Sequence, residues 1–282
     1  MNKIKTFFEM IKFEHTVFAL PFAYMGMLLA KKSWPSWGVF FLVTLAMAGA
    51  RTAGMTLNRI ADRAIDAKNP RTKKRALVTG EFSLAGAWAA VAVSIVIFFT
   101  AVYFLNDLCF KLSPVALVLL CGYHYVKRFS WLCHFVLGAV LGIAPVGGWI
   151  AVTGNFDWSP VLLALAVMGW VGGFDILYSL QDVEFDKEHR LHSVPVQFGE
   201  KKALLISSAC HVATVLFFGA FGYVAGLGIV YFVGVAVVLQ LLYVEHRLLA
   251  DGDLSRLNMA FFNVNGWVGI LLFVFTWLDI YR

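Results

Sequence analysis

The feature that most constrains this chain is a series of nine apolar runs separated by short polar loops. Each run is close to the length of about 20 residues that crosses the hydrocarbon of a bilayer as a helix. A spanning segment has to satisfy its own backbone hydrogen bonds, so helices are predicted for all nine. The runs cover residues 15–31, 37–57, 83–105, 110–126, 131–153, 159–180, 203–223, 226–244 and 260–280. The sequence thus predicts an all-α polytopic membrane protein with nine transmembrane helices.

The composition excludes a water-soluble protein. Hydrophobic residues make up 60% of the chain and charged residues 14%, against about 25% charged residues in a typical soluble domain. No charged stretch is long enough for a second, soluble domain, so residues 1–282 are predicted to form one integral membrane domain. The four cysteines show no spacing typical of a metal site and are interpreted as small apolar residues of the spans.

The positions of the cations predict the orientation of the chain. Of the 23 lysines and arginines, 18 lie in loops on the side of the N-terminus and four on the opposite side. Loops rich in Lys and Arg stay in the cytoplasm. The N-terminus is therefore expected inside, and the C-terminus outside, a prokaryotic inner membrane. The net charge of +6 reports this topology and does not indicate a nucleic-acid partner.

The stretch "NRIADRAIDAKNPRTKKRALVTG", residues 58–80, interrupts the apolar pattern with two aspartates and seven cations. Asn58, Asp62 and Asp66 recur every fourth residue, which places all three on one face of a helix. Arg51, seven residues earlier, falls on that face too. A charge inside a span is costly to insert, so Arg51 needs a partner or water.

A second acidic stripe lies in "DILYSLQDVEFD", at helical spacing. It consists of Asp175, Tyr178, Asp182 and Asp186. Its last two acids repeat the spacing of the first set at a distance of 120 residues, and a Gly-Glu pair opens the next span in both places. The sequence therefore predicts a weak internal duplication of a four-helix unit, with both stripes at the cytoplasmic edge of the membrane.

Two facing rows of carboxylates suit Mg²⁺, a hard cation that binds one or two carboxylates together with substrate phosphates. Such rows could hold two Mg²⁺ ions with a diphosphate between them. Nearby cations could screen the remaining charge of the diphosphate. These cations are Arg71, Lys73, Lys74, Arg75, Lys127 and Arg128. A diphosphate at the membrane surface, with its organic part in the bilayer, describes an isoprenoid diphosphate.

Two other interpretations stay open on these residues alone. The acids could simply neutralise loop cations at wet helix ends. A proton- or cation-coupled transporter also uses acids within the membrane, but usually near the midplane, where Gly or Pro interrupts the helices. Here the paired acids lie at cytoplasmic helix ends, which favours the diphosphate site.

The first motif resembles that of the UbiA-type intramembrane aromatic prenyltransferases, a likeness that extends over essentially the whole chain. The family pattern NDxxDxxxD is matched by Asn58, Asp62 and Asp66, with Arg59 where a second acid is usual. The same variation occurs in the branch that prenylates hydroxybenzoate. The following "NPRTKKRALVTG" resembles the basic element of that branch, with Ala76 where proline is usual.

The second family motif, DxxxD after a tyrosine, is matched by Tyr178, Asp182 and Asp186. The resemblance implies a nine-helix bundle around a central cavity, with Mg²⁺ and a prenyl diphosphate between the two motifs. The implied magnesium–diphosphate ligands are Asn58, Asp62, Asp66, Asp182 and Asp186. The implied further contacts to the diphosphate are Arg75, Lys127 and Arg128.

The aromatic acceptor is expected near Arg51, which resembles the family's partner for the acceptor carboxylate; an ion pair with Asp175 is the alternative. The implied reaction is attack of the acceptor ring on an allylic carbocation, which the ring of Tyr178 would stabilise. Asp175 is the candidate that orients or deprotonates the acceptor. His15 could point into the site or simply end the first helix. The implied acceptor is 4-hydroxybenzoate, for ubiquinone, or 1,4-dihydroxy-6-naphthoate, for menaquinone by the futalosine route, which the element at 191–195 resembles.

Four glycines follow small-xxx-small spacing in the fifth run. They are Gly138, Gly142, Gly147 and Gly148. Such spacing allows helix backbones to approach closely, so this run is expected to pack tightly against its neighbours.

Overall fold

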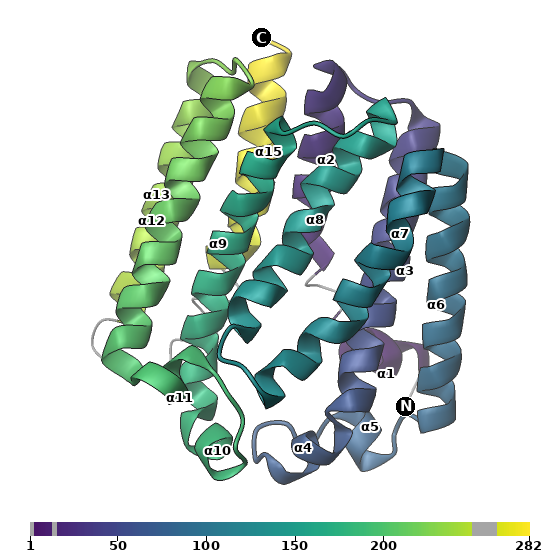
Figure 1. Ribbon diagram of the computed structural model, residues 1–282, viewed down its shortest axis with the longest axis vertical. Helices are drawn as coiled ribbons and strands as arrows, with labels where there is room; N and C mark the ends of the chain where they lie inside the picture. The colour runs from purple at the N-terminus through teal and green to yellow at the C-terminus, as the bar shows by residue number, and fades with distance from the viewer. Residues whose placement is uncertain (1–2, 13–15, 250–263) are drawn as a thin grey trace.

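The computed structural model describes residues 3–12, 16–249 and 264–282, and the regular structure in these parts is helical. The helices are α1 (Lys3–Met10), α2 (Thr16–Lys31), α3 (Trp37–Ala61), α4 (Arg63–Lys68), α5 (Ala76–Thr79), α6 (Leu84–Leu105), α7 (Asp107–Gly122), α8 (Cys133–Thr153), α9 (Ser159–Ser179), α10 (Val183–Glu188), α11 (Val194–Phe198), α12 (Glu200–Val224), α13 (Ile229–Leu249) and α15 (Asn265–Ile280), with short 3-10 helices η2 (Tyr123–Arg128) and η3 (Leu180–Asp182). The long helices lie side by side along the longest axis, and α4, α5, α10 and α11 gather at the end opposite the C-terminus (Figure 1).

Seven of the described helical segments are long and apolar enough to cross a membrane. They are Trp37–Ala61, Leu84–Leu105, Asp107–Arg128, Cys133–Thr153, Ser159–Glu188, Glu200–Val224 and Ile229–Leu249. Two shorter apolar helices, Ala19–Lys31 and Asn265–Ile280, correspond to the other two predicted runs. The parts of the chain just before them, residues 13–15 and 250–263, lie outside the described residues. The all-α membrane class is confirmed, whereas the count of nine spans stays a prediction.

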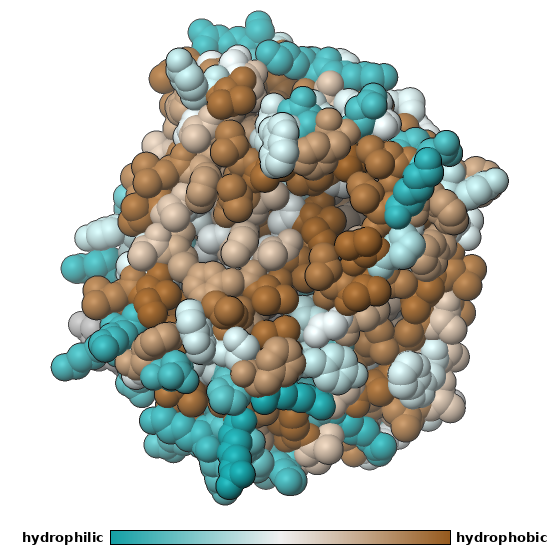
Figure 2. Space-filling view, in the orientation of Figure 1, coloured by the Kyte–Doolittle hydropathy of each residue, from teal (hydrophilic) through white to brown (hydrophobic). Residues whose placement is uncertain are grey.

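The distribution of apolar and polar residues on the surface also fits a membrane protein. Figure 2 shows a broad hydrophobic band across the middle of the visible face, with hydrophilic residues towards both ends. Phe41, Val96, Phe104 and Leu216 are all more than 60% exposed. So many large apolar side chains on the outside would be unfavourable in water but are suited to lipid. The outer faces of α3, α6 and α12 therefore match a bilayer environment.

Helix α8 packs between α9 and α2 at glycines, as the small-residue spacing predicts. A Cβ atom on Gly138 would lie 2.3 Å from the carbonyl oxygen of Met168 on α9. A Cβ atom on Gly148 would lie 2.1 Å from the carbonyl oxygen of Ala23 on α2. Neither separation is possible for a side chain, so only glycine permits these contacts. Gly147, by contrast, faces open space.

A buried polar link joins α9 to α13 and α15. The indole Nε1 of Trp170 donates a hydrogen bond of 2.7 Å to Oδ1 of Asn265. The amide Nδ2 of Asn265 in turn donates to Oε1 of Glu245 over 2.6 Å. All three side chains are at most 2% exposed. Because buried polar groups are costly when unpaired, this link specifies how the three helices fit together.

Both acidic stripes leave the continuous helix on which the spacing placed them. Helix α3 ends at Ala61, and Asp62, with φ −92° and ψ 2°, separates it from α4. Helix α9 ends at Ser179, so Asp182 lies in η3 and Asp186 in α10. Both helices are thus interrupted inside their motifs, but only Asp62 separates α3 from α4, and η3 and α10 follow α9 without a gap. The breaks allow short segments at this end of the bundle to fold around a common cavity.

Candidate active site

A polar cavity of about 820 Å³ opens among α3, η2, α8, α9 and the loop after α4. The sequence-predicted residues that line it are Arg51, Asn58, Arg71, Lys74, Arg75, Lys127, Asp175, Tyr178, Asp182 and Asp186. The structure therefore brings residues of both motifs to one cavity, although they are more than 100 positions apart in the chain. His15 lies outside the described residues.

Two cations of η2 hold Asp62 of the first motif, which, like Asp66 and Arg128, is a predicted site residue that does not line the cavity. Asp62 is 2% exposed. Its Oδ2 accepts a 2.5 Å hydrogen bond from Nζ of Lys127, and its Oδ1 lies 3.3 Å from Nη2 of Arg128. Nδ2 of Asn58 approaches the same carboxylate to 3.5 Å. The buried charge of Asp62 is thus balanced by the two cations that the family resemblance implied as diphosphate contacts.

Asp66, the last acid of the first motif, is paired within its own loop. Nη1 of Arg75 donates to Oδ2 of Asp66 over 2.6 Å. The hydroxyl of Thr72 donates to the backbone carbonyl of Asp66 over 3.1 Å. These two contacts fold the loop between α4 and α5 back over Asp66. Arg75, a predicted diphosphate contact, thus forms an ion pair with Asp66, a predicted metal ligand.

Arg71 connects the two motifs. Its Nε donates to Oδ1 of Asp182 over 3.0 Å, and its Nη2 donates to Oδ2 of the same carboxylate. Its Nη1 donates to the hydroxyl of Tyr178 over 3.2 Å, and its guanidinium carbon lies 5.3 Å from the centre of that ring. Burial would lower the pKa of Arg71, but the hydrogen bonds and charge of Asp182 outweigh it and raise that pKa. This forked ion pair joins the loop after α4 to η3.

Asn69 and Arg59 take positions that the sequence did not indicate. Nδ2 of Asn69 donates to Oδ1 of Asp182 over 3.1 Å, so an amide of the first loop also reaches the second motif. Arg59, which replaces the usual acid, donates from Nε to the carbonyl oxygen of Met10 over 3.1 Å. It thereby ties α3 to the end of α1.

His134 is the main residue that sequence reasoning missed. It is 2% exposed, lines the polar cavity, and its Nδ1 lies 2.7 Å from Oδ2 of Asp175. Among the described side chains, His134 is thus the hydrogen-bond partner of Asp175, a place that the sequence had offered to Arg51. No spacing in the sequence joins residues on two different helices, so only the packing of α8 on α9 brings this pair together.

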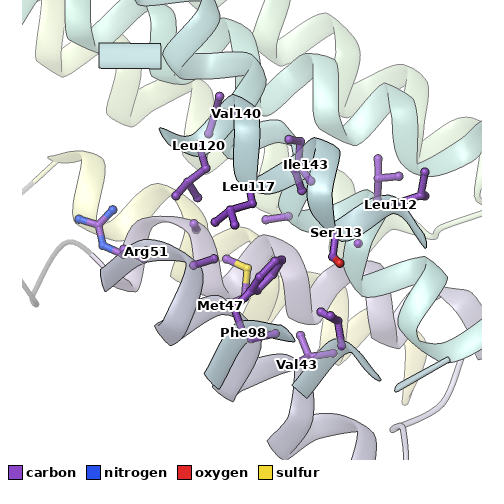
Figure 3. A pocket seen from close by; sticks show the side chains of 18 of the residues that line it. Val43, Met47, Arg51, Phe98, Leu112, Ser113, Leu117, Leu120, Val140 and Ile143 are labelled. Carbon is purple, nitrogen blue, oxygen red and sulfur yellow. The ribbon is translucent and has the colours of Figure 1, made fainter. Parts of the chain in front are cut away.

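An apolar cavity of about 230 Å³ adjoins the polar one. Figure 3 shows Arg51 at one end of it and Leu112 and Ser113 at the other, with Met47, Leu117 and Leu120 between them. Four residues line both cavities. They are Arg51, Met55, Tyr123 and Leu141. One chamber therefore runs from a charged end to a hydrocarbon-lined end, and a guanidinium stands at the junction.

The side chains of the two motifs are of the chemical type that binds Mg²⁺. Four aspartate carboxylates and one asparagine amide offer the oxygen ligands that this cation prefers. Three of these carboxylates are paired with Arg or Lys in the structure. Among the described residues, no three or more Asp, Glu, His or Cys side chains are grouped closely enough to hold a metal ion together. A metal would therefore have to compete with these cations.

The fold and the site together define a class of protein: an all-α integral membrane protein with a chamber that is charged at one end and apolar at the other. The family model described as "UbiA prenyltransferase family" matches residues 19–269, and the chain belongs to this family. It is a prenyltransferase, which transfers a prenyl group from a prenyl diphosphate to an acceptor. This identification decides between the enzyme and the transporter in favour of the enzyme.

Individual relatives are similar over most of the chain. The 4-hydroxybenzoate octaprenyltransferase of Sodalis glossinidius is 32% identical over 246 residues, which are 87% of this chain and 84% of that protein. The apo structure of a UbiA homologue from Aeropyrum pernix K1 has a TM-score of 0.86 and 39% identity, covering 94% of this chain and 98% of that one. A UbiA homologue from Archaeoglobus fulgidus bound to GPP and Mg²⁺ shares the fold, with a TM-score of 0.72 at 19% identity, covering 98% of this chain and 100% of that one.

Proposed function

We propose that this enzyme prenylates the ring of a carboxylated phenol in quinone biosynthesis, with 4-hydroxybenzoate as the acceptor. The observation that carries the proposal is the position of Arg51 between the polar and the apolar cavity. A guanidinium there can bind a carboxylate in forked geometry and hold the ring between the diphosphate and the hydrocarbon. Relatives that are about 30% identical carry the name 4-hydroxybenzoate octaprenyltransferase.

The diphosphate end of the substrate would bind in the polar cavity. Asn58, Asp62, Asp66, Asp182 and Asp186 would hold Mg²⁺. When bound, Mg²⁺ supplies positive charge that stabilises the diphosphate as it leaves. The cations that now neutralise these acids are Arg71, Arg75, Lys127 and Arg128. They are placed to bind the diphosphate oxygens with charge-assisted hydrogen bonds.

The prenyl chain would extend from the polar cavity towards the apolar one. Cleavage of the bond between C1 and the diphosphate oxygen leaves an allylic cation, which water would destroy. The apolar walls around Met47, Leu117 and Leu120 exclude water from this part of the chamber. The ring of Tyr178, at the border of the polar cavity, offers its face to the cation. Asp175, deeper on α9, then orients or deprotonates the acceptor.

The active site would face the cytoplasm, since 18 of the 23 lysines and arginines lie in loops on the side that carries both motifs. In this arrangement α2 and α15 are the first and the last of nine spans, and the whole chain is one domain.

A second acceptor, 1,4-dihydroxy-6-naphthoate, is supported by the sequence element at residues 191–195, which touches the cavity at His192 and Ser193. Both acceptors carry a carboxylate for Arg51. The test is therefore an assay of purified enzyme with radiolabelled geranyl diphosphate, Mg²⁺ and either acceptor. Asp62→Asn tests the site. Lys73→Gln is the matched control, because the structure, against the expectation from the sequence, leaves this exposed cation outside the polar cavity and out of contact with both motifs among the described residues.

We expect label to move to 4-hydroxybenzoate in the wild type and in Lys73→Gln, and at least about a hundredfold less in Asp62→Asn. Transfer to the naphthoate alone would replace the first acceptor by the second. Transfer to neither, with folded protein, would refute the proposal of a carboxylated phenol.

A further inference from the structure

The pair His134–Asp175 lies at the wall of the polar cavity but outside the ion pairs of the two motifs. His134 is the second residue of α8 and is almost fully buried, whereas the side chain of Asp175 is 29% exposed. Oδ2 of Asp175 faces Nδ1 of His134 at 2.7 Å. Among the described residues, none hydrogen-bonds to the other oxygen, Oδ1. One carboxylate oxygen is thus held by protein and the other is free for a substrate.

A backbone amide determines which nitrogen of His134 carries the proton. The N–H of Val194, at the start of α11, donates to Nε2 of His134 over 3.2 Å. An N–H can only donate to a bare nitrogen, so Nε2 is unprotonated. The imidazole is then neutral and its one proton is on Nδ1, from which it donates to Asp175. This hydrogen bond orients the carboxylate of Asp175 without giving it a proton.

The loop that supplies the amide is itself fixed at three points. Ser193 caps α11 by accepting a 3.4 Å hydrogen bond from the N–H of Val196. The N–H of His192 donates to the carbonyl oxygen of Lys127 over 2.7 Å, and Sγ of Cys133 lies 3.4 Å from the carbonyl oxygen of His192. The element at 191–195 therefore joins η2, which holds Asp62, to the pair His134–Asp175. Residues 191–195, which the sequence showed only as a resemblance to other chains, thus have a structural role: they hold the backbone amide that contacts His134.

We infer that His134 is a positioning residue, which the amide of Val194 holds in the Nδ1–H form so that Asp175 presents an ionised Oδ1 as proton acceptor to the ring of the prenylated substrate. The inference rests on the proposed function. The electron pair of the C1–oxygen bond leaves with the diphosphate, and a pair from the acceptor ring forms the new carbon–carbon bond. The ring carbon then loses its proton to Oδ1 of Asp175, and its bonding pair restores the aromatic ring. His134 itself transfers no proton, since Val194 occupies its other nitrogen.

Two substitutions separate the two hydrogen bonds of His134. His134→Asn places an N–H donor where Nδ1 was, so it keeps the bond to Asp175 and loses the acceptor for Val194. His134→Gln places its amide near Nε2, so it can accept from Val194 but loses the donor to Asp175. A merely structural role would make the two variants similar or make the glutamine variant the better one.

The readout is the effect of deuterium at the reacting ring positions of the acceptor, measured with whichever of the two acceptors the wild type prenylates. With the base in place, ring deprotonation follows the difficult step and the isotope effect on kcat stays near one. We expect the same for His134→Asn. In His134→Gln we expect kcat at least about tenfold lower, short of the roughly hundredfold loss of an entire general base, together with an isotope effect above one. A glutamine variant with wild-type kcat and no isotope effect would overturn the inference.

A second measurement does not depend on turnover. In protein labelled with ¹⁵N-histidine, the signals of His134 are those of the seven histidines that disappear in His134→Asn. One bare and one protonated nitrogen, the latter at Nδ1, support the inference. The Nε2–H form or an imidazolium would refute it. Absence of turnover with both acceptors would instead count against the proposed function, and the NMR result would still decide the state of His134.

Discussion

Substitution of Gly148 by alanine should destabilise the protein. The added Cβ would lie 2.1 Å from the carbonyl oxygen of Ala23, about 1.3 Å short of the 3.4 Å at which ordinary contact begins. The obstacle is backbone of α2, which cannot rotate away as a side chain can, so α2 and α8 have to separate. Overpacking of this kind costs about 1–3 kcal/mol, and the better helix propensity of alanine returns at most about 1 kcal/mol. We expect a net loss of about 1–2 kcal/mol.

Gly147→Ala is the matched control, because the neighbouring position on the same helix has no atom within 4 Å of an added Cβ. Thermal unfolding in detergent, followed by the monodisperse fraction on size-exclusion chromatography, compares the two variants. Gly148→Ala should lower the melting temperature by about 2 °C or more, and Gly147→Ala should leave it unchanged or raise it slightly. A Gly148→Ala variant as stable as the wild type would show that α2 and α8 do not approach as closely as described.

Two further predictions concern the polar cavity. Arg71→Gln removes the forked contact to Asp182 and a candidate diphosphate ligand. Because hydrogen bonds to charged groups contribute roughly 1.5–3 kcal/mol, KM for geranyl diphosphate should rise about tenfold or more. Steady-state kinetics measure this KM with Lys73→Gln as the control, and an unchanged KM would show that Arg71 does not bind the diphosphate. Removal of divalent cations with EDTA should abolish transfer in the assay, and excess Mg²⁺ should restore it. Full activity in EDTA would contradict the proposed magnesium site.

The linear order of residues was sufficient to predict the membrane class and the two acidic motifs. Long apolar runs have few stable arrangements in lipid other than helices, so periodicity and composition decide the class without any knowledge of contacts. The tight packing of α8 could also be predicted from its glycines, because close backbone approach requires the absence of a side chain whichever helix is the partner. The sequence did not predict which helix each glycine contacts, namely α9 for Gly138 and α2 for Gly148.

The tertiary structure alone decided how the charges are distributed. Spacing placed each acidic stripe on one helix, but α3 ends before Asp62 and α9 ends at Ser179. Asp62 meets cations of η2, Asp66 meets Arg75 of its own loop, and Asp182 meets Arg71 from the other half of the chain. A sequence contains candidate cations without saying which acid each will meet, since that depends on how the loops pack. Arg71 pairs with Asp182 in this way, and the hydrogen bond between His134 and Asp175 depends on packing in the same manner. They lie on segments 111 and 41 positions apart, and only the packing of the helices brings each pair within hydrogen-bonding distance.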